Sequence, residues 1–307
     1  MKKIISCLLC AVILLSTLSC TGYQKNNKSS VITTCFPIYD IARHLLSDDI
    51  DVTLLLKPGQ DSHSYDPSAK DMIKIKSCDL FICIGGQDES WVNTLLSGKD
   101  MKNVRSLSLI QSVPPIAFDE GHNEHDGHDH SHAYDEHIWT SPKNMMLMLE
   151  VVKNELSEVF PEISQEINER AEEYLISLSE LDERLTSAVS NASRNILIFG
   201  DRFPFLHLVT DYGISYEAAY PGCSEMTEPS AQTVASLINT VNEQGIPAIF
   251  RTQLSNGRVA NAIAEQTGAQ VLVLHSLASI TKDEWNANET YFSLMIKNIE
   301  AIEIALG

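Results

Sequence analysis

Positive charge is scarce in this chain. Among its 307 residues, lysine and arginine number 22 against 41 aspartates and glutamates, which gives a formal net charge of −19 at pH 7. A protein that binds nucleic acid needs a basic surface to neutralise phosphates, so we expect no nucleic-acid partner. An acidic surface suits a protein that handles cations, although acidity alone usually serves only solubility.

Common signatures of hydrolases are also missing. The sequence has no HExxH motif of zinc proteases and no GxSxG nucleophile elbow. Its 14 glycines and 11 prolines are too few for a fibrous or low-complexity chain, and 44% of hydrophobic residues is ordinary for a soluble globular protein. The length favours two domains or one large one.

The one long apolar run lies at the start of the chain. Two lysines precede the apolar residues 4–15, a run shorter than the ~20 residues that span a bilayer. This pattern is typical of a secretory signal peptide over residues 1–19. The segment that ends in Cys20 resembles the lipobox of bacterial lipoproteins. The resemblance implies an exported protein, periplasmic or on the outer surface of the cytoplasmic membrane, that is anchored by lipid on Cys20 and tethered by residues 20–30. The alternative is ordinary cleavage nearby, with Cys20 lost.

The remaining cysteines do not form a metal-binding pattern. Beyond the signal peptide and Cys20, no CxxC pair occurs, and three of the four cysteines sit in apolar runs. We therefore expect small core residues rather than a zinc knuckle or disulfides. These cysteines are Cys35, Cys78, Cys83 and Cys223.

Short apolar strands alternate with helical patterns in both halves of the sequence. Strands are expected at 31–36, 52–56, 80–84, 196–199, 214–216, 248–250 and 271–274. Continuous apolar strands that alternate with helices indicate mostly parallel sheets covered by helices on both faces. The predicted fold is therefore α/β, with two similar lobes at 31–155 and 193–307.

A long helix is expected between the lobes. From Ile163 to Ala188, apolar residues recur every three or four positions, which places them on one stripe of a helix. Such a helix, with Pro161 in its first turn, would be ~45 Å long for about 30 residues. This length exceeds one small domain, so we predict a rigid spine over residues 156–192.

Half of the ten histidines lie in one acidic segment, residues 121–132, which contains no core-forming run. Imidazole and carboxylate groups are ligands for borderline divalent metals. A flexible loop cannot hold one fixed tetrahedron, so the segment is interpreted as an accessory metal-collecting loop. Its histidines are His122, His125, His128, His130 and His132.

Three other histidines flank expected strands or helices. His63 follows the strand at 52–56, His137 precedes a helix that begins at Pro142, and His275 directly follows the strand at 271–274. The carboxyl ends of parallel strands face the crevice in which α/β proteins bind ligands. A fixed site between the lobes could therefore take two histidines from one lobe and one from the other. Each histidine alone could equally be a half-buried polar residue in a turn. His207 is interpreted as a packing residue.

Two motifs carry a family resemblance. The stretches PGQDSHSYDPS at 58–68 and DEHIWTSPKN at 135–144, with the acidic His-rich loop just before the second, resemble the solute-binding lipoproteins of bacterial zinc and manganese ABC importers. The match is to the zinc-type branch and covers nearly all of residues 31–307. It implies a non-enzymatic, monomeric protein that captures Zn²⁺ between two lobes and delivers it to an ABC permease and its ATPase. It also implies that His63, His137 and His275 are metal ligands.

The sequence departs from the family pattern at one position. Gly200 stands where the family usually carries another histidine, immediately before an aspartate. Either the site has three protein ligands, or Asp201 supplies an oxygen; Glu225 is a further candidate. Three histidines with at most one carboxylate favour Zn²⁺ over Mn²⁺. A surface adhesin or metal buffer of the same fold, and an exported zinc hydrolase, are the alternative functions.

Overall fold

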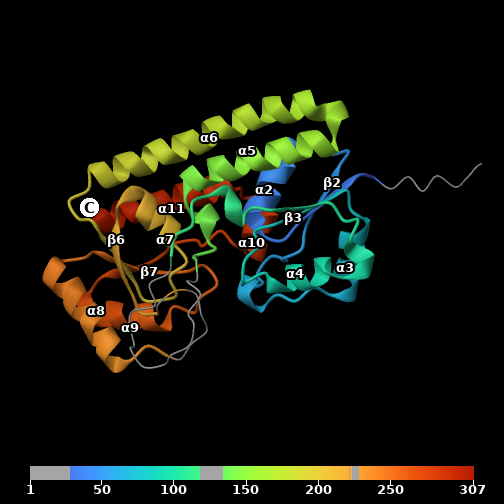
Figure 1. The fold of residues 1–307 in the computed structure, drawn as a ribbon. Coiled ribbons are helices and arrows are strands. Elements are labelled where there is room, and N and C mark those ends of the chain that lie inside the picture. The colour runs from blue at the N-terminus through green and yellow to red at the C-terminus, as the bar shows by residue number, and fades with distance from the viewer. Residues whose placement is uncertain (1–27, 118–133, 221, 223–227) are drawn as a thin grey trace, which may run out of the picture.

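Two α/β lobes lie side by side beneath a pair of long helices (Figure 1). This computed structural model describes residues 28–117, 134–220, 222 and 228–307. Each lobe contains a four-stranded sheet in which all strand pairs are parallel. The predicted fold of two parallel-sheet lobes is confirmed. In the described part of the chain, no helix combines the length and the apolar character that crossing a membrane requires.

The first sheet has the strand order β2-β1-β3-β4. Its strands are β1 (Ser30–Thr33), β2 (Asp51–Leu54), β3 (Leu80–Cys83) and β4 (Ser106–Ser108). Its helices are α2 (Phe36–Leu45), α3 (Ala69–Ser77) and α4 (Ser90–Leu96). Strand β3 is buried along its whole length, because its side chains pack on both faces of the sheet.

The second sheet repeats this plan with the order β6-β5-β7-β8. Its strands are β5 (Ile196–Phe199), β6 (Ser215–Ala218), β7 (Ala248–Arg251) and β8 (Gln270–Val273). Its helices are α7 (Leu206–Tyr212), α8 (Ala231–Gln244), α9 (Arg258–Thr267), α10 (Lys282–Asn286) and α11 (Tyr291–Leu306). In each sheet the strand order reverses beside the first strand, and the carboxyl ends of the strands there are the usual position of an α/β ligand site.

The two long helices are α5 (Pro142–Val159) and α6 (Ser164–Ser190). The helix predicted over 156–192 is therefore shorter, and residues 156–159 belong to α5. The break falls at Phe160 and Pro161, because a residue before proline avoids the helical region, and Phe160 has φ −123° and ψ 65°. With 27 residues, α6 is ~40 Å long. It packs against α5, α2 and α11, and so contacts both lobes.

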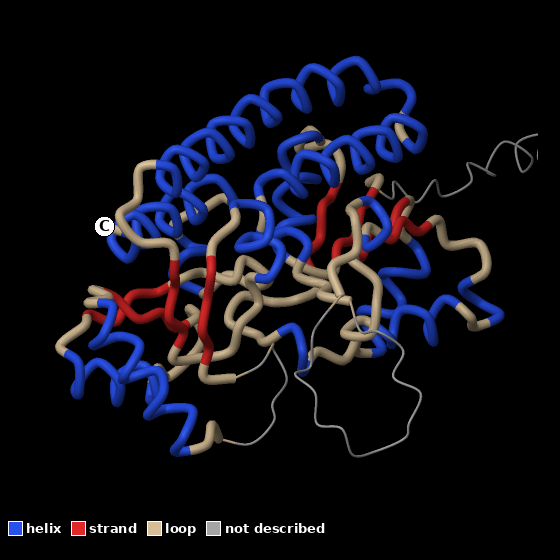
Figure 2. The backbone as a smooth tube through the Cα atoms, turned by 60° about the vertical axis from the view of Figure 1, so that its left-hand side comes forward, coloured by secondary structure: helices blue, strands red, loops and turns tan. Residues whose placement is uncertain are grey.

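The lobes share a buried interior. One continuous apolar cluster includes Ile41 of α2, Leu178 of α6 and Ile302 of α11. Hydrogen bonds cross between the lobes as well: the indole of Trp139 donates to the carbonyl of Ser276 at 2.9 Å, and the Phe36 N–H donates to the carbonyl of Ala278 at 3.1 Å. We expect only modest movement of one lobe against the other. Figure 2 shows the two sheets beneath the helices from a second direction.

Candidate metal centre

Three loops of the first lobe bring His63, Asp88 and His137 together. Each residue offers one ligand atom, and these atoms all lie within 4.8 Å of one another. His63 Nδ1 is 3.4 Å from a carboxylate oxygen of Asp88, and the rings of His63 and His137 are 5.7 Å apart between centroids. Donors around a tetrahedral zinc with bonds of 2.0–2.1 Å stand about 3.4 Å apart, so shifts of roughly 1 Å would close the group around an ion.

His63 lies in a single turn of 3₁₀ helix, Ser62–Ser64, which follows β2. Asp61 caps this turn, and its carboxylate accepts the backbone N–H of His63 at 3.0 Å. The side chain of an N-cap aspartate satisfies a donor that the turn itself cannot satisfy. The cap therefore fixes the backbone of His63 at the carboxyl end of the sheet.

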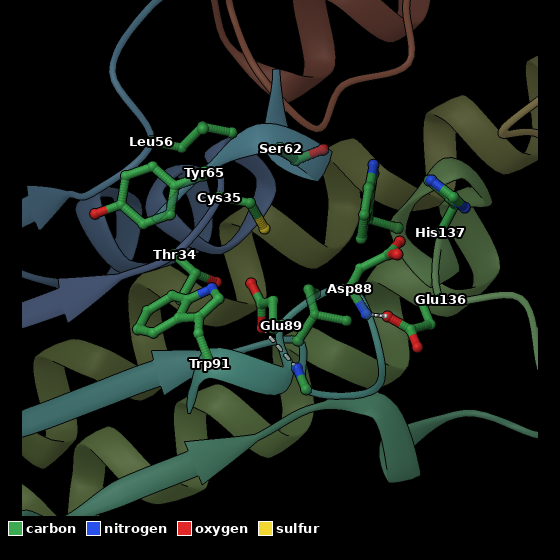
Figure 3. A pocket seen from close by; sticks show the side chains of 13 residues that line it. Thr34, Cys35, Leu56, Ser62, Tyr65, Asp88, Glu89, Trp91, Glu136 and His137 are labelled. Carbon is green, nitrogen blue, oxygen red and sulfur yellow. Dashed lines mark hydrogen bonds between the residues drawn. The ribbon is translucent and has the colours of Figure 1, made fainter. Parts of the chain in front are cut away.

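Asp88 reaches the group through a tight loop after β3. Gly85 and Gly86 adopt φ values of +86° and +97°, which side chains other than glycine rarely tolerate. An added Cβ at Gly86 would collide with the carboxylate of Glu136. That carboxylate accepts the backbone N–H groups of Gln87 and Asp88, the latter at 2.9 Å. Figure 3 shows the bond from Asp88. Glu136 thus holds the loop that presents Asp88.

His137 is oriented by its neighbour Asp135. The Asp135 carboxylate accepts the backbone N–H of His137 at 3.0 Å and lies 3.4 Å from its Nδ1. Burial opposes ionisation of Asp135, but the charge and hydrogen bond of His137 outweigh it and lower the pKa of that carboxyl. A proton on Nδ1 would be held by this carboxylate, which makes Nε2 the metal-binding nitrogen.

His207 of α7 supports the same segment from the second lobe. Its side chain is 1% exposed, its Nδ1 lies 3.0 Å from the amide nitrogen of Asn144, and its Nε2 lies 3.1 Å from the carbonyl of Asp135. Both ring nitrogens are therefore engaged, one with Asn144 of α5 and the other with Asp135, two residues before His137. This contact links the second lobe to the metal centre without placing a ligand there.

The charge of the group suits a divalent cation. A hydrogen bond with His63 lowers the pKa of Asp88 and outweighs its partial burial. Asp88 is therefore ionised at neutral pH, beside two imidazoles. Two nitrogens and one carboxylate oxygen form a donor set that Zn²⁺ accepts well. Burial raises the pKa of the nearby Glu89 to about 7, so the Glu89 carboxyl titrates close to neutrality.

Two cavities meet at the group. The first, of about 30 Å³, lies within the first lobe and is lined by Cys35, Asp88, Glu89 and His137, among others (Figure 3). The second, of about 60 Å³, lies between the lobes. His63 and His137 form one wall of the second cavity, and residues of the second lobe form the other. A metal held by the group would therefore face the second lobe.

His275 is placed at the carboxyl end of β8, as the sequence predicts, but the structure does not bring it to His63 and His137. Its Nδ1 accepts the backbone N–H of Leu277 at 2.9 Å, and its Nε2 lies 3.2 Å from a carboxylate oxygen of Glu284. The ring is 4% exposed and holds the loop after β8 against α10.

Asp201 is also held by neighbours of its own. One carboxylate oxygen accepts the Arg202 N–H at 2.9 Å, and the other accepts the N–H and hydroxyl of Thr252 at 2.8 and 3.0 Å. It is not part of the described ligand group. At Gly200, an added Cβ would collide with the backbone of Ala260 in α9. A histidine at that position would displace the helix.

Several predicted residues lie outside the described part of the chain. They are Cys20, Glu225, Cys223 and the five histidines of the loop at 121–132. The described ends of that loop are nevertheless joined: Ala117 and Tyr134 form an antiparallel bridge, and the Asp135 N–H donates to the carbonyl of Ile116 at 3.0 Å. The loop therefore leaves and returns beside His137. Cys35, Cys78 and Cys83 are free thiols.

The pair of His275 and Glu284 predicts an acid-dependent loss of stability. Burial opposes ionisation of Glu284, but hydrogen bonds from His275 and Thr281 lower its pKa from 4.5 to about 2. A depressed carboxyl pKa stabilises the fold above the unfolded-state value and ceases to do so as the pH falls toward the folded-state value. Urea unfolding of Glu284→Gln should therefore show a smaller drop in stability between about pH 5 and pH 3 than the unsubstituted protein. The exposed control Glu172→Gln should keep the full drop; equal slopes in all three proteins would contradict the assignment.

Fold and site together define a two-lobed α/β protein with a candidate metal centre facing the cleft between its lobes. The chain belongs to the family described as "Zinc-uptake complex component A periplasmic", which it matches over residues 31–305. The resemblance that the two histidine motifs carry is therefore confirmed.

Curated relatives support the same family. The chain is 30% identical over 289 residues to the zinc-binding protein AdcA of Streptococcus pyogenes. The aligned region covers 90% of this chain and 56% of AdcA. It is 30% identical over 307 residues to the zinc-binding lipoprotein AdcA of Streptococcus pneumoniae, at 99% and 61% coverage. It thus spans less than two thirds of these relatives. It is 27% identical over 291 residues to the high-affinity zinc uptake system protein ZnuA of Bacillus subtilis, at 92% and 89% coverage.

Solved structures share the fold. The Zn(II)-bound ZnuA-like domain of AdcA from Streptococcus pneumoniae superposes with a TM-score of 0.77 at 28% identity, covering 91% of this chain and 99% of that one. The laminin-binding protein Lmb of Streptococcus agalactiae, described as bifunctional with adhesin and metal transporting activity, gives 0.77 at 22% identity, with 91% and 100% coverage. The second likeness concerns the fold alone.

Proposed function

We propose that the protein is an extracytoplasmic solute-binding protein that captures Zn²⁺ and delivers it to an ABC permease. The observation that carries this proposal is the convergence of His63, Asp88 and His137 at the cleft between the lobes. The zinc-binding names of the AdcA and ZnuA relatives support the choice of metal. Here Zn²⁺ is the cargo of the protein, and no reaction is catalysed.

The ligand set that we propose differs from the sequence-based expectation in one lobe. Asp88 takes the third position, which the resemblance assigned to His275. His275 and Asp201 instead stabilise the two loops of the second lobe that face the ion. This division suits a carrier, because all three protein ligands move with one lobe while the other lobe covers the metal. A small separation of the lobes would expose the ion without breaking a bond to the protein.

The remaining partners follow from the sequence and the relatives. Lipid on Cys20 would hold the protein at the membrane, beside a permease and its ATPase. We propose that the protein acts as a monomer. The loop at 121–132 would collect metal beside His137, because its two ends are bridged three residues before that ligand.

Removal of the loop provides a test that separates the two kinds of metal binding. A chain lacking residues 121–132 should retain about one tightly bound Zn²⁺ in equilibrium dialysis, because the proposed site at His63, Asp88 and His137 contains no residue of that segment. The weaker zinc that the unsubstituted protein holds should be lost. A full-length variant with the five loop histidines replaced by asparagine should behave in the same way. Loss of all zinc in both variants would contradict the cleft site.

Function in the cell can be tested through growth. A strain that lacks this protein should grow poorly when zinc is chelated, and the unsubstituted chain should restore growth. The chain with His137→Ala should be exported in equal amounts but should fail to restore growth. Full rescue by His137→Ala would show that zinc delivery does not depend on the cleft.

A further inference from the structure

The peptide group that joins Asp135 to Glu136 connects several parts of the candidate metal centre. The Asp135 carboxylate accepts the backbone N–H of His137 at 3.0 Å. The Glu136 carboxylate accepts the backbone N–H of Asp88 at 2.9 Å and so holds the loop that presents this ligand. Two of the three proposed ligands, His137 and Asp88, therefore depend on the position of this one peptide group.

A histidine of the second lobe holds that peptide group. Nε2 of His207, in α7, lies 3.1 Å from the carbonyl oxygen of Asp135. A carbonyl oxygen can only accept a hydrogen bond, so Nε2 carries a proton and donates it. Nδ1 of His207 lies 3.0 Å from the side-chain nitrogen of Asn144, which can only donate, so Nδ1 accepts. The two neighbours thus specify one neutral tautomer of a ring that is 1% exposed.

Helix α7 also contacts the chain on the other side of His137. It packs against the 3₁₀ turn Ile138–Thr140, which directly follows this ligand. The Asp211 carboxylate accepts the Ser141 hydroxyl, and the Asp211 carbonyl accepts the Lys143 ammonium at 3.1 Å. The backbone is therefore fixed before and after the ligand by one helix of the second lobe. Such support matters because a displacement of about 1 Å already impairs a functional site.

We propose that His207 is a positioning residue that sets the zinc affinity of the metal centre from the second lobe. It is not a ligand, and it acts by fixing the peptide group between Asp135 and Glu136. Asp135 in turn orients the His137 ring, and Glu136 holds the loop of Asp88. The inference rests on the proposed zinc site and adds to it a residue that the sequence indicates only as a packing residue.

Two substitutions of His207 separate this contact from simple packing. His207→Gln places an amide N–H near the position of Nε2 and can still donate to the Asp135 carbonyl. His207→Asn reaches only the position of Nδ1 and loses that bond. We expect His207→Gln to bind Zn²⁺ about as tightly as the unsubstituted chain. His207→Asn should bind it about tenfold more weakly, as loss of a group that orients a ligand does. Competition with a chromophoric chelator measures both affinities.

Thermal unfolding of the zinc-free proteins is measured beside affinity, because His207 is buried. Both variants should unfold at a similarly lowered temperature, since each leaves a buried polar group without its partner. A purely structural role would lower the stability of both variants without separating their zinc affinities. Tyr212→Phe is the matched control on α7. It removes the hydrogen bond from the Tyr212 hydroxyl to Asp182, of 2.7 Å, and should leave zinc affinity unchanged.

A two-bond ¹H–¹⁵N spectrum of the histidine rings tests the contact itself, and His207 should be the neutral tautomer with its proton on Nε2. A proton on Nδ1 in place of Nε2 would overturn the inference. Equal zinc affinities of His207→Gln and His207→Asn would overturn it as well and leave the zinc site intact. So would a loss in Tyr212→Phe as large as that in His207→Asn. Absence of tight zinc binding by the unsubstituted chain would overturn both the inference and the proposed function.

Discussion

Replacing His137 by alanine should weaken zinc binding by more than about 100-fold. Loss of groups that merely orient a ligand already lowers metal affinity 10–100-fold, and loss of the ligand itself should exceed that. The effect is large because His137 is buried at the centre of the group, between His63 and the orienting carboxylate of Asp135. Competition with a chromophoric chelator measures the dissociation constant over the required range.

Two controls accompany this variant. Circular dichroism and thermal unfolding of the zinc-free protein should show that His137→Ala keeps its fold. His275→Gln should leave zinc affinity unchanged, because His275 faces Glu284 and the Leu277 N–H, and glutamine can still donate to Glu284. If His275→Gln loses affinity as severely as His137→Ala, the ligand set must include the second lobe.

Replacing Asp88 by alanine should weaken zinc binding by about 100-fold, since it removes both a donor atom and the one ligand charge that opposes Zn²⁺. Folding should be unaffected, because the Asp88 side chain is 45% exposed and lies in a loop. Asp66→Ala, which removes an exposed carboxylate of the same lobe, is the matched control for net charge and should retain the affinity.

The role of Asp88 can be distinguished from a long-range effect of charge. Raising the salt concentration screens exposed charges beyond roughly 10 Å but leaves a direct bond to the metal. The difference between Asp88→Ala and the unsubstituted chain should therefore persist at high salt. Equal affinities of Asp88→Ala and Asp66→Ala would remove Asp88 from the site.

The sequence predicts the two lobes and part of the site for clear physical reasons. Continuous apolar strands such as 80–84 and 196–199 report burial on both faces, which is a property of parallel sheets. His63 and His137 are found because each lies in a motif with a recognisable family pattern. Asp88 likewise follows a predicted strand, the one at 80–84. The expectation that ligands bind at the carboxyl ends of parallel strands, which pointed to His63, therefore applies to Asp88 as well.

Other features depend on contacts that the sequence does not display plainly. His275 occupies the predicted strand end, but its orientation is decided by Glu284, nine residues later. Thr281 and Glu284 have the spacing of a capping box, and the structure forms that box. The position of Glu284 could therefore be predicted in part from the sequence. The break between α5 and α6 at Pro161 could also be predicted, because proline disfavours the helical conformation at the preceding residue. The contact of Gly200 with Ala260 of α9 could not be predicted from the sequence, because it forms only when the second lobe is folded.

The most direct test is a crystal structure of the zinc-loaded protein with an anomalous difference map at the zinc absorption edge. The account predicts one strong cleft peak within bonding distance of His63, Asp88 and His137, with His275 still directed at Glu284. A peak bonded to His275 or Asp201, with Asp88 directed away from the metal, would contradict it.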